Sequence, residues 1–228
     1  MSTLSGGPNV VTNGLLAWLD AGNIKSYVSG STAWTDLSRN ASNGTLINGP
    51  IFNTANGGNI IFDGTNDYCD IPIPTINSYN TVTICGFIKP LSLSFGMFLG
   101  FTDYDVFAYS NSLGYNNAQG NVIGISSATV TSLGLLGNWR HYAFVMNKTG
   151  LLSTNKIYIN AVSQGTLTPQ LASDGNIPGF TTNLSLCTWN AGGYYGNIQY
   201  GNLQVYNREL TAAEITQNYN ATKTRFGL

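Results

Sequence analysis

Short apolar runs alternate with clusters of turn-forming residues along most of this chain. The clearest run, residues 139–146, reads Trp-Arg-His-Tyr-Ala-Phe-Val-Met, and a strand would place its alternate side chains on opposite faces. Residues 81–88 alternate in the same way and stop before Pro90, because proline cannot donate a hydrogen bond to a neighbouring strand. Similar runs recur from Gly14 to Tyr206 with Gly, Asn, Ser or Asp between them. This pattern predicts an all-β protein.

The first quarter of the chain has a weaker strand pattern than the rest. Residues 23–59 are rich in Gly, Asn and Ser and are broken by single apolar residues, so we expect a loop-rich stretch with brief strands. Beyond it, residues 59–62 and 68–71 flank the sequence Asp-Gly-Thr-Asn-Asp at 63–67. Turn chemistry between two apolar runs predicts a β-hairpin.

One helix is predicted, near the C-terminus. Thr211 and Glu214 have the spacing of a capping box, in which each side chain binds a free backbone N–H of the first helical turn. Ile215 and Tyr219 are four residues apart and would pack one helix face onto the protein. We therefore expect a helix over about residues 212–219.

The strands and the terminal helix form one predicted domain. The chain shows no linker and no repeat with a period of about 20 to 50 residues. Many short strands with turns between them are typical of a β-sandwich. The predicted fold is an all-β, two-sheet antiparallel jelly-roll sandwich over residues 14–228, closed by one short C-terminal helix and preceded by a flexible N-terminal arm over residues 1–13.

Charge and composition exclude several classes of partner. Only 8% of the residues are charged, the formal net charge is −1, and the nine Lys and Arg residues are scattered, so no nucleic acid is expected as a partner. No apolar run approaches the roughly 18 residues of a membrane span. Residues 1–8 have neither the basic nor the apolar segment of a signal peptide. We expect a soluble protein that does not contact membranes.

The three cysteines, Cys69, Cys85 and Cys187, are widely spaced and include no Cys-x-x-Cys pair. We expect three buried free thiols that act as small apolar residues. Cys69 and Cys85 lie in strand-like runs, so a disulfide between them is left open.

Catalysis is not expected. Glycoside hydrolysis needs two carboxyl groups about 5–9.5 Å apart, and both glutamates, Glu209 and Glu214, belong to the helical region. Asp103 and Asp105 form an acidic pair two residues apart, but two solvated loop or strand-end carboxylates are the favoured explanation. His141 is the only histidine, so a catalytic triad cannot be built, and we expect it to be hydrogen-bonded on a sheet face.

Sugar binding commonly combines aromatic rings, which stack on C–H faces, with polar groups that bind hydroxyls. Two stretches offer both: residues 101–105 with Tyr109 and Tyr115, and the glycine-rich loop at residues 189–196 with Tyr200. The candidate ligand-binding residues are Asp103, Tyr104, Asp105, Tyr109, Trp189, Asn190, Tyr194 and Tyr195. Core positions or oligomer contacts are the alternative explanation for the same aromatic residues.

Seven segments, taken in order, resemble one known family. They are GLLAWLDAG (14–22), WTDLS (34–38), NGTL (43–46), FDGTNDY (62–68), WRHYAFV (139–145), IYIN (157–160) and VYNRELT (205–211). Together they resemble the laminin-G-like, concanavalin A-like lectin/glucanase domain over about residues 14–221. The opening Asp-Ala-Gly and the ending at residues 214–227 are similar to domains of tailed-bacteriophage structural proteins.

This resemblance implies a jelly roll that binds glycans or protein surfaces. It favours a non-enzymatic virion protein, a capsid decoration or tail-fibre component, whose partners are other virion proteins or further copies of itself in a homo-oligomer. The alternative is a stand-alone lectin that recognises a cell-surface glycan, and a glucanase-type enzyme is the least favoured of the three.

The resemblance also raises calcium as a cofactor, since laminin-G-like domains often bind one Ca²⁺ through oxygen ligands. The candidate metal ligands are Asp63, Asn66 and Asp67, with Asp103 and Asp105 as further candidates. However, residues 63–67 are also explained as a turn held by its own Asp and Asn side chains. The stretch 199–202 lacks the carboxylate that many family members have there.

Overall fold

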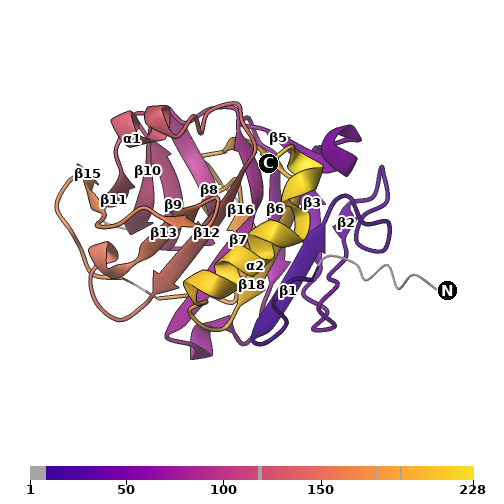
Figure 1. The fold of residues 1–228 in the computed structure, drawn as a ribbon, viewed down its shortest axis with the longest axis horizontal. Coiled ribbons are helices and arrows are strands. Elements are labelled where there is room, and N and C mark those ends of the chain that lie inside the picture. The colour runs from indigo at the N-terminus through magenta and orange to yellow at the C-terminus, as the bar shows by residue number, and fades with distance from the viewer. Residues whose placement is uncertain (1–8, 118–119, 178, 191) are drawn as a thin grey trace.

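The computed structural model describes residues 9–117, 120–177, 179–190 and 192–228, and these form a sandwich of two antiparallel β-sheets (Figure 1). Sheet A contains β1 (Leu15–Asp20), β4 (Ile51–Asn53), β5 (Asn59–Asp63), β7 (Thr81–Pro90), β12 (Arg140–Asn147), β13 (Lys156–Ile159), β14 (Val162–Ser163), β17 (Asn197–Tyr200) and β18 (Asn202–Tyr206). Sheet B contains β2 (Ala33–Trp34), β3 (Gly44–Ile47), β6 (Tyr68–Pro72), β8 (Phe95–Phe101), β9 (Tyr104–Tyr109), β10 (Ser112–Asn117), β11 (Val122–Ile125), β15 (Thr168–Leu171) and β16 (Asn183–Leu186). The predicted fold class is therefore confirmed.

The helices are short and lie outside the two sheets. The α-helices are α1 (Ser127–Ser132) and α2 (Ala212–Thr222), and the 3-10 turns are η1 (Ala55–Gly57), η2 (Ile76–Ser78), η3 (Leu152–Thr154) and η4 (Lys223–Phe226). The sequence did not predict α1, whose N-cap Ser126 binds the backbone N–H of Thr129 without a capping-box glutamate. Neither α-helix in the described residues has the length and apolar character of a membrane span.

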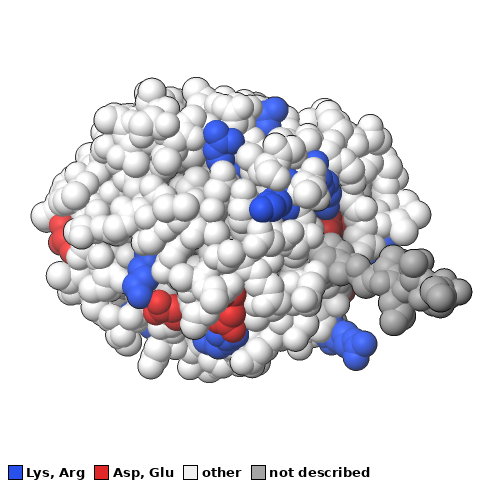
Figure 2. All heavy atoms as spheres, in the orientation of Figure 1, with Lys and Arg blue, Asp and Glu red and all other residues white. Residues whose placement is uncertain are grey.

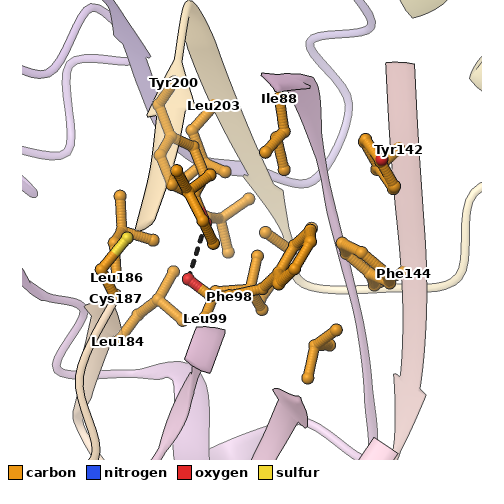
Figure 3. Close-up of a cluster of buried hydrophobic side chains, with 14 of the residues drawn as sticks. Ile88, Phe98, Leu99, Tyr142, Phe144, Leu184, Leu186, Cys187, Tyr200 and Leu203 are labelled. Atoms are coloured by element: carbon orange, nitrogen blue, oxygen red, sulfur yellow. Dashed lines mark hydrogen bonds between the residues drawn. The ribbon is translucent and has the colours of Figure 1, made fainter. Parts of the chain in front are cut away.

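The main core fills the space between the sheets (Figure 3). Tyr142 and Phe144 of β12 project from sheet A towards Phe98 of β8, with ring centroids 5.9 and 6.4 Å from that of Phe98. Tyr200 is also buried, and its hydroxyl donates to the backbone oxygen of Phe98 at 2.6 Å. Each such side chain stabilises the fold by about 1.5–3 kcal/mol through burial alone.

The helix α2 lies across the outer face of sheet A, in front of β7 and β18 (Figure 1). Its capping box forms as predicted: Thr211 accepts from the Glu214 backbone N–H, and Glu214 accepts from the Thr211 backbone N–H. The helix begins at the predicted residue and ends three residues later than expected. Ile215, on the face of α2 that points to sheet A, is fully buried in a cluster with Cys85 and Tyr206.

The predicted arm over residues 1–13 needs a correction at its C-terminal part. Val11 is buried, and its backbone N–H donates to Asn218 Oδ1 at 2.8 Å while its carbonyl accepts from the Tyr206 hydroxyl at 2.9 Å. Residues 9–13 are therefore held against α2 and β18, because their backbone groups find buried partners there. Residues 1–8 lie outside the described part of the chain.

The predicted hairpin at residues 59–71 is wrong. β5 pairs with β4 and β17 in sheet A, whereas β6 pairs with β3 and β16 in sheet B. The turn at residues 64–67 therefore carries the chain from one sheet to the other. Turn chemistry specifies a reversal of direction, and it does not specify whether the two strands pair.

The cysteines and the histidine are buried. Cys69, Cys85 and Cys187 are free, as predicted, and burial raises the pKa of Cys85 to about 12. His141 lies on the outer face of sheet A against Phe87, with ring centroids 5.1 Å apart. The expected hydrogen bond to this histidine is not seen: neither ring nitrogen has a partner among the described residues, and burial lowers its pKa to about 3.

Charged side chains are sparse on the face that carries α2. In Figure 2 the blue and red groups are few on a mostly uncharged surface, some of them lie side by side, and they form no continuous field of one sign. Three ion pairs link the described residues: Lys156 with Glu209, Arg208 with Glu214, and Arg225 with Asp20. This surface offers no basic track for a phosphate backbone.

Candidate functional site

The outer face of sheet B has a small apolar cluster of its own. Met97 of β8, Phe107 of β9 and Val122 of β11 are buried there, and Tyr109 and Leu171 pack against them. Alternation along β9 explains the arrangement, because successive strand residues point to opposite faces. An apolar patch on the outer side of a sandwich marks a candidate binding surface.

The loop between β16 and β17 forms one wall above this cluster. The indole Nε1–H of Trp189 donates to the backbone oxygen of Thr102 in the β8–β9 turn. Further along the loop, the backbone oxygen of Tyr194 accepts from the Met97 N–H at 2.7 Å. These bonds hold the side chains of Trp189 and Tyr194, 6.0 Å apart between ring centroids, beside the outer face of β8.

Loop and strands together enclose a pocket of about 290 Å³. Its described lining consists of Phe95, Met97, Asp105, Phe107, Tyr109, Asn116, Asn117, Gly120, Val122, Leu171, Trp189 and Tyr194. The volume is close to the lower end of small-molecule sites, which typically have about 300–1,000 Å³. The described lining contains five aromatic rings and one carboxyl group, and it contains no Lys, Arg or His.

Asp105 is the polar centre of this pocket. It is 1% exposed, its Oδ2 accepts from Asn116 Nδ2 at 3.1 Å, and its Oδ1 has no hydrogen-bond partner among the described residues. Burial raises the pKa of this carboxyl group to about 8, and the nearby charge of Asp103 adds to the rise. At neutral pH Asp105 is therefore mostly protonated in the free protein.

Gly100 makes room for Asp105 on the neighbouring strand. The two residues are directly paired between β8 and β9, and a Cβ at position 100 would lie 2.1 Å from the Asp105 Cβ. A side chain at this position would displace Asp105, so the glycine is required by the close approach.

A second, polar pocket of about 380 Å³ lies beside the first. It is lined by Asp70, Gly100, Phe101, Thr102, Thr181, Thr182, Asn183, Ser185, Thr188 and Asn190. Within it, Ser185 Oγ donates to Asp70 Oδ1 at 2.6 Å. Strand pairing aligns Asp70, Ser185, Gly100 and Asp105 in one row, so the two pockets share the outer face of sheet B.

Five of the eight predicted ligand-binding residues line one of these pockets. Asp105, Tyr109, Trp189 and Tyr194 meet in the aromatic pocket, although they come from two separate stretches of sequence. Asn190 lines the polar pocket.

The other three predicted residues lie elsewhere. Tyr104 is in the core between the sheets, because it neighbours Asp105 on a strand and must face the opposite side. Asp103 lies in the β8–β9 turn, and the Tyr195 ring lies 6.5 Å from that of Tyr68. Tyr115, expected near the same site, is also in the core and donates to the backbone oxygen of Lys156.

The sequence analysis missed Phe95, Phe107 and Asn116 as lining residues. Phe107 had a usable signal, since it stands two residues from both Asp105 and Tyr109 and so shares their strand face. Phe95 and Asn116 lie on neighbouring strands, and their place depends on the pairing of β8 and β10 with β9.

The candidate calcium ligands at residues 63–67 are engaged by their own turn. Asp63 Oδ1 accepts from the backbone N–H of Thr65 at 2.7 Å, and Asp67 Oδ2 accepts from the Asp63 N–H at 3.2 Å. Asn66 contributes its backbone oxygen to Asn48 Nδ2. The described residues contain no group of three or more His, Cys, Asp or Glu side chains that could hold a metal ion. This donor set fits a self-bonded turn better than a Ca²⁺ site with its six to eight oxygen ligands.

Several solved structures share the fold. A botulinum neurotoxin serotype D ligand-binding domain in complex with N-acetylneuraminic acid matches with a TM-score of 0.65 and 10% identity over 92% of this chain and 51% of that one. The receptor-binding domain of botulinum neurotoxin C/D mosaic serotype matches with a TM-score of 0.63 and 11% identity over 92% of this chain and 52% of that one. Trypanosoma rangeli sialidase in complex with sialic acid matches with a TM-score of 0.63 and 13% identity over 93% of this chain and 33% of that one.

The chain thus spans about half the length of the toxin structures and a third of the sialidase. At these identities the likeness concerns the fold. No curated protein matches the chain in sequence. The family model described as the concanavalin A-like lectin/glucanases superfamily matches residues 63–216, which include β6 to β18 and the described lining of both pockets. Because this match covers more than half of the chain, the protein belongs to the concanavalin A-like lectin/glucanases superfamily.

Proposed function

We propose that this chain is a non-catalytic carbohydrate-binding domain and that the aromatic pocket on sheet B receives a sugar. One observation carries the proposal: the pocket combines aromatic rings with a buried carboxyl group and two Asn side chains. Aromatic faces stack on the C–H faces of sugars, while a few placed polar groups bind the hydroxyls. The superfamily supports the proposal, and so do the sialic acid complexes of the toxin domain and the sialidase.

The separation of the carboxyl groups supports binding without hydrolysis. Glycosidases place their two carboxyl groups about 5–9.5 Å apart. Asp70 and Asp105 face the same side of sheet B but are three strand spacings apart, which amounts to roughly 14 Å. Asp103 lies in the turn, outside the described lining of the aromatic pocket.

Two neighbouring tyrosines provide a matched test. Tyr194 lines the pocket, whereas Tyr195 faces Tyr68 outside it. We expect the unmodified domain to bind members of a glycan array, and Tyr194→Ala to weaken that binding about tenfold or more, since a lost stacking contact of about 1.4 kcal/mol is a factor of ten. Tyr195→Ala should leave binding within about twofold.

Titration calorimetry with the best array ligand measures both variants, and a reducing-end assay on the same ligand checks for hydrolysis. Equal losses in the two variants would place the site elsewhere. Release of new reducing ends by the unmodified domain would refute the non-catalytic part of the proposal.

The virion role predicted from the sequence stays a prediction. It rests on the similarity of residues 14–22 and 214–227 to tailed-bacteriophage structural proteins. Light scattering coupled to size-exclusion chromatography tests it: a stable trimer or larger assembly favours a structural role, whereas a glycan-binding monomer favours the lectin.

A further inference from the structure

We propose that the aromatic pocket selects an amino sugar with a free, protonated amine, and that this amine binds beside Asp105. The inference rests on the proposed function and narrows it to one chemical class of ligand. Three features of the pocket support this proposal: the unsatisfied oxygen of Asp105, the aromatic rings in the lining, and the charges of the walls.

The first feature is the incomplete hydrogen bonding of Asp105. Asn116 satisfies Oδ2, but Oδ1 is buried with no partner among the described residues. A buried acceptor without a donor costs stability, and a buried carboxylate needs an opposite charge. An ammonium group has three N–H donors and a positive charge, so it would satisfy both needs at once.

The second feature is the set of aromatic rings that line the same pocket as the carboxyl group. Phe95 contacts three of the other rings. The centroid of its ring lies 5.0 Å from that of Phe107, 5.3 Å from that of Tyr194 and 6.4 Å from that of Tyr109. Trp189 extends the cluster through Tyr194. Aromatic faces attract a desolvated cation through their negative ring faces. A neutral sugar would gain the stacking energy without this attraction.

The third feature is the charge of the walls. The described lining supplied by β8, β10, β11 and β15 is uncharged, and the ionisable groups that face the pocket are Asp105, Tyr109 and Tyr194. Asp103 lies in the adjacent turn, outside this lining, and its charge acts on Asp105 from there. An anionic sugar would therefore meet carboxyl groups and no described counter-ion, whereas a cationic sugar would find complementary charge.

The protonation of Asp105 supplies a signature of this binding mode. Burial raises the pKa of the free carboxyl group to about 8, and a bound ammonium would lower it by favouring the ionised form. At pH 6.5 binding should therefore release a proton from Asp105, and affinity should rise with pH as long as the free amine itself stays protonated.

The test compares three β-1,4-linked trisaccharides by titration calorimetry: glucosamine, N-acetylglucosamine and glucose. We expect the glucosamine trimer to bind at least about tenfold tighter than either neutral trimer. Asp105→Asn should remove this preference while it retains the Asn116 hydrogen bond and the size of the side chain. The matched control Asp103→Asn, which changes a carboxyl group outside the described lining, should keep most of the preference.

A second measurement needs no variant. Titrations of the unmodified protein at pH 6.5 in buffers of different ionisation enthalpy should show proton release for the glucosamine trimer and none for the glucose trimer. If the neutral trimers bind as tightly as glucosamine, the amine proposal is wrong and carbohydrate binding stands. If none of the three trimers and no array glycan binds, the proposed function itself is wrong.

Discussion

The outer faces of the two sheets are both partly apolar. The chain covers the apolar residues of one face with helices and leaves those of the other face accessible. On sheet A, α2 and η4 cover the apolar side chains: Ile215 packs on Cys85 and Tyr206, and Phe226 stacks on Phe87 at 4.3 Å between ring centroids. On sheet B no helix of the described residues covers the cluster around Met97, and a loop that stands beside it leaves a pocket. The comparison indicates that apolar residues stabilise the fold on one face and are available to a ligand on the other.

Each face also buries one titratable side chain without a complete set of partners. Among the described residues, neither ring nitrogen of His141 under α2 has a hydrogen-bond partner, and neither has Oδ1 of Asp105 in the open pocket. Burial favours the neutral form of both, so it lowers the pKa of the histidine to about 3 and raises that of the carboxyl group to about 8. The two faces should therefore respond to pH in opposite directions.

Removal of a contact on the covered face should have the largest effect on folding. Ile215→Ala leaves a cavity under α2 at a position with no exposure, and we expect a loss of about 4 kcal/mol in the free energy of unfolding. Urea denaturation measures it. Glycan affinity in the folded variant should not change, since the site is on the other sheet. A loss below about 1 kcal/mol would mean that α2 is not an integral part of the fold.

The next effect concerns the open face and is stabilising. The folded-state pKa of Asp105 lies above its unfolded value of 3.8, so the folded protein binds the extra proton and loses stability as the pH rises from about 4 to 8. Asp105→Asn removes this loss. We expect the variant to be about 3 kcal/mol more stable at pH 6 and similar to the unmodified protein at pH 4. Urea denaturation of both proteins at both pH values measures this difference in the free energy of unfolding. A difference that does not change with pH would contradict the proposed burial of the Asp105 carboxyl group.

The smallest of these effects belongs to His141. Its folded-state pKa lies below the unfolded value of 6.5, so the unfolded chain binds the extra proton and stability falls as the pH drops from about 6.5 towards 3. His141→Phe keeps a ring between Phe87 and Tyr219 and does not titrate. Relative to pH 8, the variant should retain about 2 kcal/mol more stability at pH 5 than the unmodified protein. Parallel stability profiles of the two proteins between pH 8 and 5 would show that the folded protein takes up the same proton as the unfolded chain, and the lowered pKa of His141 would be wrong.

The sequence was sufficient for features that depend on local chemistry. The capping box at Thr211 and Glu214 predicted the start of α2, and the alternation of residues 139–146 predicted a strand. The error at Tyr104 came from treating a stretch of sequence as one site, although strand geometry separates that residue from Asp105. The burial of Asp105 and the position of Phe95 were beyond the sequence, because they depend on which strands pair and on the bulge in β8 between Met97 and Leu99.

The pairing of the first strand with the last has a consequence for biosynthesis. Leu15 of β1 aligns with Tyr206 of β18, and Arg225 forms an ion pair with Asp20 at the end of β1, 2.5 Å between Nη1 and Oδ1. At about 5–20 residues per second, the ribosome delivers Tyr206 roughly 10–40 s after Leu15. The apolar β1 segment therefore emerges long before its partner strand, and sheet A can close only after β18 has left the ribosome. During that interval the apolar side chains of β1 lack their partner strand, and the domain completes its folding in one late step.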